Sequence, residues 1–542
     1  MPLHLGQQHE SIHTVSDTRN LAGTHRLDVD PADAFDVIVI GSGMGGMTSA
    51  AALSRMGRKV LLLEQAQTIG GLTHAFSREG FSWDVGLHYC GTFGRDQIAG
   101  RTLNWLSGGA IEFRSVGTVY DILHFPEGFE IPVARPVAAY QMELKEQFPD
   151  NANEIDAYFE ALLSAEETMH AIAAERAMPG SIRNAHRWWN KKRFRHWCGR
   201  TTSEVIADLV TDPRLAAVLS AQWGTYGGKP TEASFGVHAL VIGHYLEGAY
   251  YPVGGAATIA KGLVPVIEAG GGSARAGTPV TEILVEDGKS VGVRTASGDE
   301  FRAPVIVSDI GAGETVKRLL PSEIRRQEWA SEIAAYKPSI CHFQMYLGFE
   351  GDIASLGASR ANHWYYNSWD TNDAIWSTSD DDAVPMMFVS FPTLKDAAHD
   401  PGPSNRHTGE LLVWSDWSSV AKYATHRTGA LASEWVDLKQ RIESRLMECF
   451  AAKFPALAPL VVFQELGTPL ATASFTGHEK GAFYGVETTP RRILSDALNA
   501  RTPVPGLFLT GQDVMAPGIA GALAGGMLGA AAIDPRVLQH LK

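Results

Sequence analysis

The sequence predicts an α/β protein of two or more domains, and three observations lead to this fold class. An apolar run at residues 36–40 enters a glycine-rich turn, which leads into a helix-forming segment and a second apolar run at residues 59–63. Residues 280–307 hold further short β-type runs separated by turn residues. The chain has 542 residues, 45% of them hydrophobic, which is enough for at least two hydrophobic cores. We therefore expect a parallel sheet with an antiparallel meander, together with a mixed α+β domain.

The elements near the amino terminus form one βαβ unit. Residues 36–40 are apolar and β-branched, which is typical of a buried parallel strand. Residues 47–56 are rich in alanine and other good helix formers, and Gly57 marks the end of that helix. The second strand, residues 59–63, runs into Glu64. This order predicts two parallel strands joined by a right-handed crossover.

The rest of the chain alternates between helical and strand patterns. Helical periodicity dominates residues 140–220, for example at 154–163 and 205–219. Three β-type runs follow, with turn signals at Asp287-Gly288 and Ser297-Gly298, and they predict the antiparallel meander. Later runs predict three further strands. The six runs are residues 280–285, 291–296, 301–307, 341–347, 386–391 and 507–510.

Composition excludes several classes of protein. The formal net charge of −14 argues against a general nucleic-acid binder. The four cysteines (Cys90, Cys198, Cys341 and Cys449) lie far apart without a C-x-x-C pair, so we expect neither a metal site nor a disulfide framework. This cysteine usage predicts a reducing, cytoplasmic location.

Two segments need to be weighed as targeting or membrane elements. Residues 1–34 are polar and lack a basic region followed by an apolar core, so we expect a flexible arm rather than a signal peptide. Residues 514–533 carry no charge and are long enough to cross a bilayer. They contain Pro517, five glycines and many alanines, however, which favours a helix packed closely inside the protein.

A glycine motif predicts a dinucleotide site. Gly41, Gly43 and Gly46 fit G-x-G-x-x-G, where the first glycine allows a tight turn, the second a close approach of a pyrophosphate, and the third close helix packing. The following helix offers free N–H groups to phosphates. Glu64 ends the second strand, where an acid can accept hydrogen bonds from a ribose. The second glycine pair, Gly70-Gly71, favours a flavoprotein of the glutathione-reductase type over a nicotinamide-binding domain.

These motifs together resemble one known family. The chain reads GSGMGG at 41–46, LEQ at 63–65, GG at 70–71, HAF at 74–76 and FSWDVGLHY at 81–89. Further matches are YPVGG at 251–255 and LTGQDVMAPGIAGAL at 509–523. This pattern resembles the flavin-dependent phytoene desaturase superfamily, and most closely its branch of carotenoid isomerases and all-trans-retinol 13,14-reductases.

The resemblance implies FAD as cofactor and a split domain that binds it. This domain would comprise residues 35–115, 250–320 and 490–542, with a substrate domain at 116–249 and 321–489. The residues expected at the cofactor are Gly41, Ser42, Gly43, Met44, Gly45, Gly46, Glu64, Gln65, Gly70, Gly71, Leu72, His74, Val280, Gly511, Asp513, Gly518, Ile519, Ala520 and Ala522.

The activity that the resemblance implies is hydride transfer at flavin N5 to or from double bonds of an apolar isoprenoid or polyene. Desaturation, saturation and redox-neutral isomerisation stay open. No second G-x-G-x-x-G follows a strand, so a dedicated nicotinamide domain is not expected, and the electron partner stays open. The alternatives are a flavin amine oxidase-like enzyme and a non-catalytic escort protein that binds prenyl groups.

Individual catalytic and lining residues are less clearly marked. His88 is the candidate proton donor or acceptor, since histidine titrates near neutrality. Its alternative role is a hydrogen-bonded histidine of the interior. Tyr226, Tyr250 and Tyr251 are candidates either for the substrate cavity or for core packing.

Residues 183–200 combine seven Lys or Arg with three Trp and one Phe, and contain no acid. This composition suits peripheral contact with an anionic membrane, or equally a solvated basic helix whose aromatic side chains pack inward.

Overall fold

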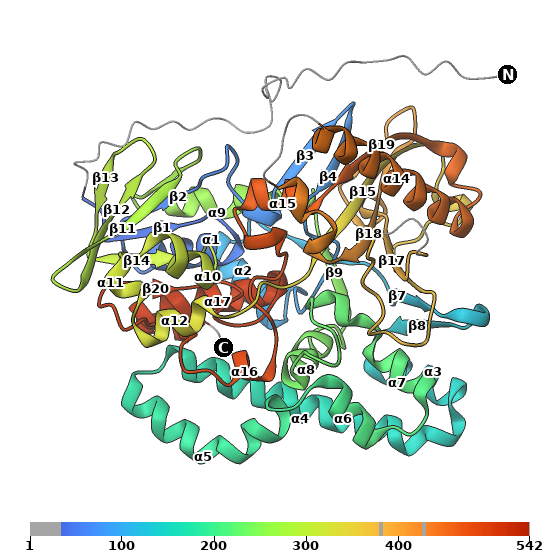
Figure 1. Ribbon diagram of the computed structural model, residues 1–542, viewed down its shortest axis with the longest axis horizontal. Helices are drawn as coiled ribbons and strands as arrows, with labels where there is room; N and C mark the ends of the chain where they lie inside the picture. The colour runs from blue at the N-terminus through green and yellow to red at the C-terminus, as the bar shows by residue number, and fades with distance from the viewer. Residues whose placement is uncertain (1–33, 379–382, 425–429, 541–542) are drawn as a thin grey trace.

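A computed structural model describes residues 34–378, 383–424 and 430–540 (Figure 1). The predicted amino-terminal arm, residues 1–34, lies outside this part of the chain except for its last residue. The described residues form two large sheets, one parallel and one mainly antiparallel, and three small sheets of two or three strands, with helices around them (Figure 1).

The parallel sheet joins stretches that are far apart in the sequence. Its strand order is β10-β2-β1-β14-β20, and all its neighbours pair in parallel. The strands are β1 (Val37–Ile40), β2 (Val60–Leu63), β10 (Ser273–Arg275), β14 (Val305–Ser308) and β20 (Leu507–Leu509). The βαβ unit and the fold class predicted from the sequence are therefore confirmed, with α1 (Met44–Arg55) as the crossover helix.

An antiparallel meander extends beside this sheet. It comprises β11 (Val280–Glu286), β12 (Lys289–Thr295) and β13 (Glu300–Arg302). The prediction of one strand over residues 301–307 is wrong, because β13 pairs within the meander while β14 pairs with β1 in the parallel sheet. Pro304 lies between them and has no N–H for a ladder, so the chain changes sheets there.

The second sheet has the order β19-β15-β18-β17-β16-β7-β8. Its strands are β7 (Val119–His124), β8 (Glu130–Ala134), β15 (Cys341–Glu350), β16 (Asn362–Tyr366), β17 (Met386–Ser390), β18 (Arg406–Ser415) and β19 (Val461–Gly467). Alternate residues of β15 point to opposite faces. Phe343, Met345 and Leu347 pack in one apolar cluster with residues of α14 (Ala430–Lys453). The side chains of His342, Gln344 and Tyr346 therefore face the other way, toward the interior of the molecule.

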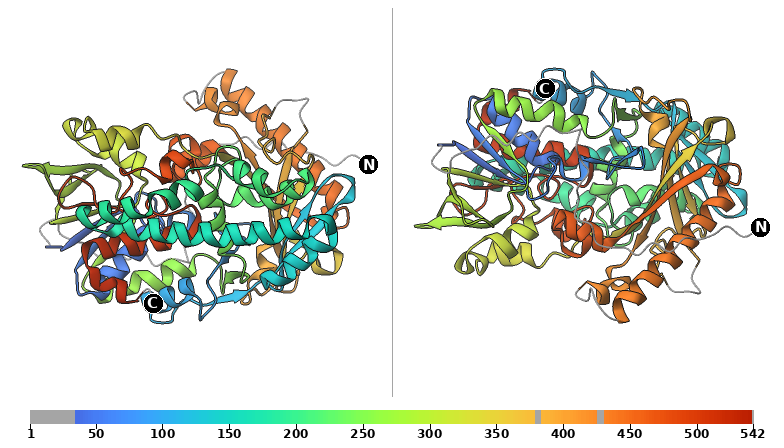
Figure 2. Two further views of the ribbon diagram at one scale, coloured as in Figure 1. Left: turned by 90° about the horizontal axis from the view of Figure 1, so that it is seen from below. Right: turned by 90° about the horizontal axis from the view of Figure 1, so that it is seen from above.

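Helices cover the remaining side of both sheets. The long α4 runs under the molecule, as Figure 2 shows from below. The helices of this region are α2 (Ile98–Ser107), α3 (Val137–Gln147), α4 (Ala152–Ala177), α5 (Gly180–Cys198), α6 (Thr202–Leu209), α7 (Pro213–Ser220), α8 (Phe235–Gly243) and α9 (Thr258–Ala269). The helical pattern at residues 205–219 is thus two helices. Asp212 is the N-cap of α7, because its carboxylate accepts the N–H groups of Arg214 and Leu215 in the first turn of that helix.

The uncharged segment near the carboxyl terminus is a buried helix. α17 (Gly518–Ile533) packs against α1, and the hydroxyl of Ser49 donates to the Gly526 carbonyl at 2.8 Å. In the part of the chain that the structure describes, no helix is long and apolar enough to cross a bilayer. Small residues in this segment therefore serve close packing of two helices.

Two of the tyrosines considered for the cavity belong to the core. Tyr226 is fully buried and contacts His238 through its hydroxyl at 3.1 Å. Tyr251 is buried and donates to Asp84. None of Tyr226, Tyr250 and Tyr251 lines the large cavity described next.

Candidate functional site

One cavity of about 2810 Å³ extends from the parallel sheet to the inner face of the second sheet. Ordinary small-molecule sites have volumes of roughly 300–1,000 Å³. The cavity therefore has room for a dinucleotide and a second, sizeable ligand. Its lining includes residues 40–45 at the end of β1 and in the turn after it, Glu64 after β2, and residues 515–524 before and within the start of α17.

The glycine turn after β1 forms a cradle for an anion. Gly41 has a φ of +94°, which favours glycine, and a Cβ on Gly46 would overlap the Gly41 carbonyl. A Cβ on Gly43 would lie 2.8 Å from the carboxyl oxygen of Asp309. No described side chain caps the start of α1, and its first turn holds no acid. The free N–H groups and the helix dipole therefore suit a pyrophosphate.

Glu64 fixes the floor of this cradle. It is buried, and its Oε2 accepts the N–H of Ser42 at 2.9 Å and the hydroxyl of Ser42 at 2.6 Å. Its Oε1 accepts the N–H of Ala66 at 2.8 Å. The Ser42 hydroxyl in turn accepts the N–H of Gly70 at 2.9 Å, so the second glycine pair is tied to the first. The carboxylate lines the cavity where a ribose would meet it.

The opposite wall comes from the last part of the chain. Gly518 has a φ of +84°, and no described side chain caps the start of α17. Asp513 is buried, and its two oxygens accept the N–H groups of Ala312 at 2.7 Å and Val486 at 3.0 Å. It thus joins three chain segments at the cavity wall.

Most of the residues predicted from the sequence to contact the cofactor line this one cavity. The exceptions are Gly46, Gly70 and Gly511, which lie behind the wall. The residues that line it are Gly41, Ser42, Gly43, Met44, Gly45, Glu64, Gln65, Gly71, Leu72, His74, Val280, Asp513, Gly518, Ile519, Ala520 and Ala522. Their convergence fits a single flavin dinucleotide held between both ends of the chain.

Asp309 is a residue of this cradle that the sequence analysis missed. Burial raises the pKa of its carboxyl well above the usual range. Burial thus favours the neutral form of this carboxyl, which is compatible with a bound phosphate. The available signal was its position directly after β14, because ligands of parallel sheets bind at the carboxyl ends of the strands.

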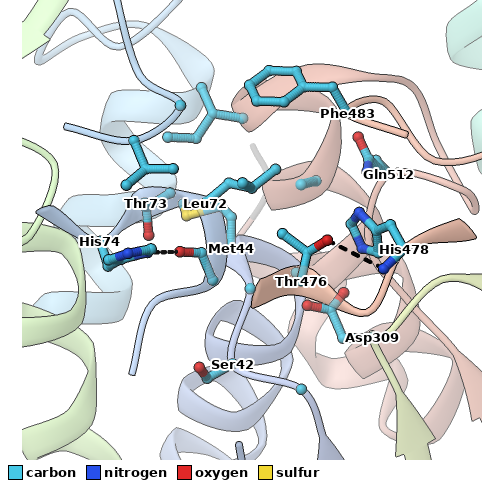
Figure 3. Close-up of a pocket in the computed structure, with 18 of the residues that line it drawn as sticks. Ser42, Met44, Leu72, Thr73, His74, Asp309, Thr476, His478, Phe483 and Gln512 are labelled. Carbon is cyan, nitrogen blue, oxygen red and sulfur yellow. Dashed lines mark hydrogen bonds between the residues drawn. The ribbon is translucent and has the colours of Figure 1, made fainter. Parts of the chain in front are cut away.

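Other lining residues come from a region without sequence motifs. Figure 3 shows Thr476, His478 and Phe483 on one side of the cavity, across from Leu72 and His74. The hydroxyl of Thr476 accepts the N–H of His478 at 3.1 Å. No local pattern marks this segment, because its place at the cavity depends on tertiary packing.

The far end of the cavity is mainly apolar and aromatic. The side chains of this wall come from neighbouring strands of the second sheet, in each of which every second side chain faces the cavity. The residues of this wall are Tyr346 on β15, Trp364 on β16, Phe388 on β17, and Leu412 and Trp414 on β18, with Leu240 and Tyr245 from the α8 side. Such a surface binds an elongated hydrophobic ligand and excludes water.

His88 lies between the cradle and the apolar wall. It lines the cavity, and its ring centroid is 5.2 Å from that of Phe388. Its Nδ1 lies 2.6 Å from Oε2 of Glu410, and its carbonyl accepts a hydrogen bond from Lys395 at 2.9 Å. The sequence left open whether His88 is a catalytic or an interior histidine. In the structure it is half-buried and lines the cavity, and Glu410 and Lys395 contact it from the side away from the cavity.

The fold and this site define a flavin-dependent oxidoreductase. A parallel sheet with a phosphate cradle, a meander and a second helix start at the carboxyl end fits a bound FAD. The chain belongs to the flavin containing amine oxidoreductase family, whose model matches residues 44–534. FAD as cofactor and the enzyme class predicted from the sequence are therefore confirmed.

Named relatives agree with the resemblance found in the motifs. The chain is 30% identical to the all-trans-retinol 13,14-reductase of Rattus norvegicus over 93% of its own length and 86% of that protein. It is 24% identical to prolycopene isomerase 1 of an Oncidium hybrid cultivar, over 91% of this chain and 82% of that protein. Among solved structures, cyclohexylamine oxidase from Brevibacterium oxydans shares the fold, with a TM-score of 0.60 and 17% identity over 93% of this chain and all of that chain. The predicted branch of the superfamily is thereby confirmed.

Proposed function

We propose that this FAD-dependent oxidoreductase acts on a carbon–carbon double bond of an apolar polyene of the retinoid or carotenoid type. The observation that carries the proposal is a single cavity that joins the anion cradle at Gly41–Gly46 to a long aromatic wall. The names of the relatives support the same substrate class. Saturation is the outcome we expect, because the reductases are more similar to this chain than the isomerases are.

The residues divide into two proposed roles. Residues 35–115, 250–320 and 490–542 form the cofactor domain, in which the α1 start holds the pyrophosphate, Glu64 the adenosine ribose, and the α17 start the flavin end. Residues 116–249 and 321–489 form the substrate domain. Bound flavin supplies hydride chemistry at N5. The aromatic wall orients the polyene and keeps water out, while His88 holds the exchangeable proton.

An amine substrate is the competing possibility within the family. It would be favoured by a narrow cavity with two aromatic side chains flanking the flavin. The cavity of about 2810 Å³ and its extended apolar wall instead support a long hydrocarbon.

The test uses purified holoprotein under anaerobic conditions. Protein reduced with dithionite and protein left oxidised are each incubated with a panel of retinoids, carotenoids and aliphatic amines, and products are identified by mass. A gain of two hydrogens from a polyene is the expected result, and a loss of two or no change in mass would indicate desaturation or isomerisation. Turnover of amines alone would overturn the proposal.

We also propose that α5 makes peripheral contact with an anionic membrane. Trp188 and Trp189 expose 74% and 81% of their surface, whereas Phe194 packs inward. Lys191, Lys192 and Arg195 are exposed on the same helix. Exposed tryptophan beside basic side chains matches the interfacial region of a bilayer. The four free thiols support the cytoplasmic location predicted from the sequence.

Vesicle sedimentation tests this contact. We expect binding to vesicles that contain phosphatidylserine and weak binding to pure phosphatidylcholine, with at least a fivefold loss in the Trp188→Ala/Trp189→Ala variant. Met142→Ala removes another exposed apolar side chain and should bind like the wild type. Equal binding of all three proteins would contradict the proposal.

A further inference from the structure

A cluster of buried ionisable groups lies behind the cavity wall, and the proposed cofactor contacts do not use it. Glu410 on β18, Lys395, Asp84 and Asp121 are each at most 5% exposed. None of the four lines the cavity. Burying charged groups is costly unless they are paired or hydrogen-bonded, so each of these side chains requires a compensating partner.

The compensating partner of Glu410 is the ring of His88. The Glu410 side chain is completely buried, and its Oε2 lies 2.6 Å from His88 Nδ1. Among the residues that the structure describes, neither Glu410 carboxylate oxygen and neither ring nitrogen of His88 has a hydrogen-bond partner, so the 2.6 Å contact is an ion-pair contact without the alignment of a hydrogen bond. His88 therefore has one nitrogen against a buried carboxylate, while the other is uncommitted on a ring that lines the cavity.

Lys395 fixes the backbone of the same histidine. Its Nζ donates to the His88 carbonyl at 2.9 Å, to the Ser390 hydroxyl at 2.7 Å and to the Asn362 side chain. Asn362 in turn donates to Asp121 at 3.0 Å. Both the main chain and the ring of His88 are thus held from the side away from the cavity.

We propose that Glu410 is the positioning residue of His88: its carboxylate, in ion-pair contact with Nδ1, holds the ring at the cavity wall so that Nε2 supplies the transferable proton to the substrate. This inference rests on the proposed function. In saturation, the Nε2–H bond of the imidazolium breaks and a C–H bond forms at one alkene carbon, while the other carbon receives a hydride from reduced flavin. Two electrons leave the flavin, and the ring ends neutral. Desaturation runs through the same atoms in reverse.

The other titratable groups around this pair do not offer the same chemistry. Burial lowers the pKa of His342 on β15 to about 4, so that ring is neutral at neutral pH. Burial raises the pKa of Asp84, the last residue of β4 (Phe81–Asp84), to about 7, and its carboxyl accepts hydrogen bonds from the Tyr251 hydroxyl and the Ala256 N–H. Tyr346 lines the cavity, but burial raises the pKa of its hydroxyl well above the usual range; burial lowers the pKa of Lys395 to about 7, but Lys395 does not line the cavity.

The first test measures single-turnover product formation by reduced holoenzyme between pH 5 and 9. His88→Gln should slow the reaction at least 100-fold, within the range usual for a lost general acid. Glu410→Gln should slow it 10- to 100-fold and move the alkaline limb of the pH profile down by one unit or more. The double variant should be no slower than His88→Gln, because the two residues act as one unit.

A second His–Glu contact in the same sheet provides the matched control. His124 Nδ1 lies 3.1 Å from Glu130 Oε2 outside the cavity. Glu130→Gln should leave both rate and pH profile unchanged. Bound-flavin absorbance and thermal melting of every variant show whether it has folded.

A readout independent of turnover separates this inference from the proposed function. In holoprotein labelled with ¹³C-histidine, the ring signal that His88→Gln removes should titrate at lower pH in Glu410→Gln than in the wild type. If wild type converts polyenes but Glu410→Gln keeps its rate and pH profile, the positioning role is wrong while the function stands. If no polyene reacts, an unchanged His88 titration in Glu410→Gln overturns the role, and a shifted titration supports it.

Discussion

Glu64 shows how one side chain connects the two halves of the cofactor cradle. Its carboxylate accepts three hydrogen bonds from Ser42 and Ala66 and still lines the cavity. In Glu64→Gln the side-chain amide places an N–H against the backbone N–H of either Ser42 or Ala66 and removes the charge that strengthens a hydrogen bond from a ribose. A lost charge-assisted hydrogen bond is worth roughly 1.5–3 kcal/mol, so we expect FAD to bind about 10- to 100-fold more weakly. Fluorescence titration of apoprotein with FAD measures this change.

The control for this prediction is Glu323→Gln, at an exposed position that does not line the cavity. It should bind FAD like the wild type. An unchanged dissociation constant in Glu64→Gln would show that the carboxylate does not contact the cofactor.

Residues in the cradle were predictable where local backbone rules determine them. Gly41 needs a positive φ directly after a strand, and Glu64 ends the neighbouring strand, so sequence spacing alone indicates both. Asp309 and Glu410 escaped prediction for a physical reason. Each acquires its role from a partner more than two hundred residues away, Gly43 in one case and His88 in the other.

At the scale of elements, the contact between α1 and α17 decides how closely the two ends of the chain approach. A Cβ on Gly526 would lie 2.6 Å from both the Gly45 carbonyl oxygen and the Thr48 Cβ. Gly526→Ala should therefore push the helices apart and lower the free energy of unfolding by about 1–3 kcal/mol, the usual cost of overpacking. Urea unfolding followed by circular dichroism measures it.

Gly180→Ala is the matched control for Gly526→Ala. Gly180 begins α5, and a Cβ there would meet no atom within 4 Å. Gly180→Ala should leave stability unchanged or raise it by up to about 1 kcal/mol. Equal effects of the two substitutions would mean that α1 and α17 are not tightly packed.

The elements whose sequence pattern is local were predicted correctly, and those that depend on a change of sheet were not. Residues 301–307 are uniformly β-type, yet the chain leaves the meander at Pro304 and enters the parallel sheet. The helical period of apolar residues continues over 205–219 although α6 ends at Leu209 and α7 begins at Pro213. Only Asp212, the N-cap, and Pro213 in the first turn indicate the break in the sequence. Of the seven-stranded sheet, only β15 and β17 were predicted as strands, and their order in the sheet was not predicted, because strand order is set by tertiary contacts.

At the scale of the whole molecule, several histidines are buried in the neutral form. Burial lowers the pKa of His238 to about 3, although its ring contacts the hydroxyls of Tyr158 and Tyr226 at 2.8 and 3.1 Å. The others with pKa values lowered mainly by burial are His124, His244 and His342, to about 4, and His363, to about 3. In the unfolded chain these groups titrate near 6.5.

Three buried acids have the opposite effect on the pH dependence of stability. Burial raises the pKa of Asp84 to about 7, that of Asp121 to about 6, and that of Asp309 well above its usual range. Their contribution to stability is complete below the unfolded value and is lost as pH rises through the folded value. They therefore stabilise the folded state as pH falls from 6.5 to 5.

The histidines outnumber these acids, so we expect the free energy of unfolding to fall between pH 6.5 and pH 5. Below pH 6.5 the histidines bind protons in the unfolded chain but stay neutral in the folded protein. Each such histidine therefore lowers the free energy of unfolding by up to about 1.4 kcal/mol per pH unit. His238→Gln keeps a side chain able to hydrogen-bond both tyrosines but cannot be protonated, so its loss of stability over this window should be smaller than in wild type by about 1–2 kcal/mol. His196→Gln, at an exposed position on α5, should keep the wild-type slope. Denaturant unfolding at both pH values measures all three proteins, and a wild-type stability that is flat or rises toward pH 5 would mean that the buried acids, not the histidines, control the acid response.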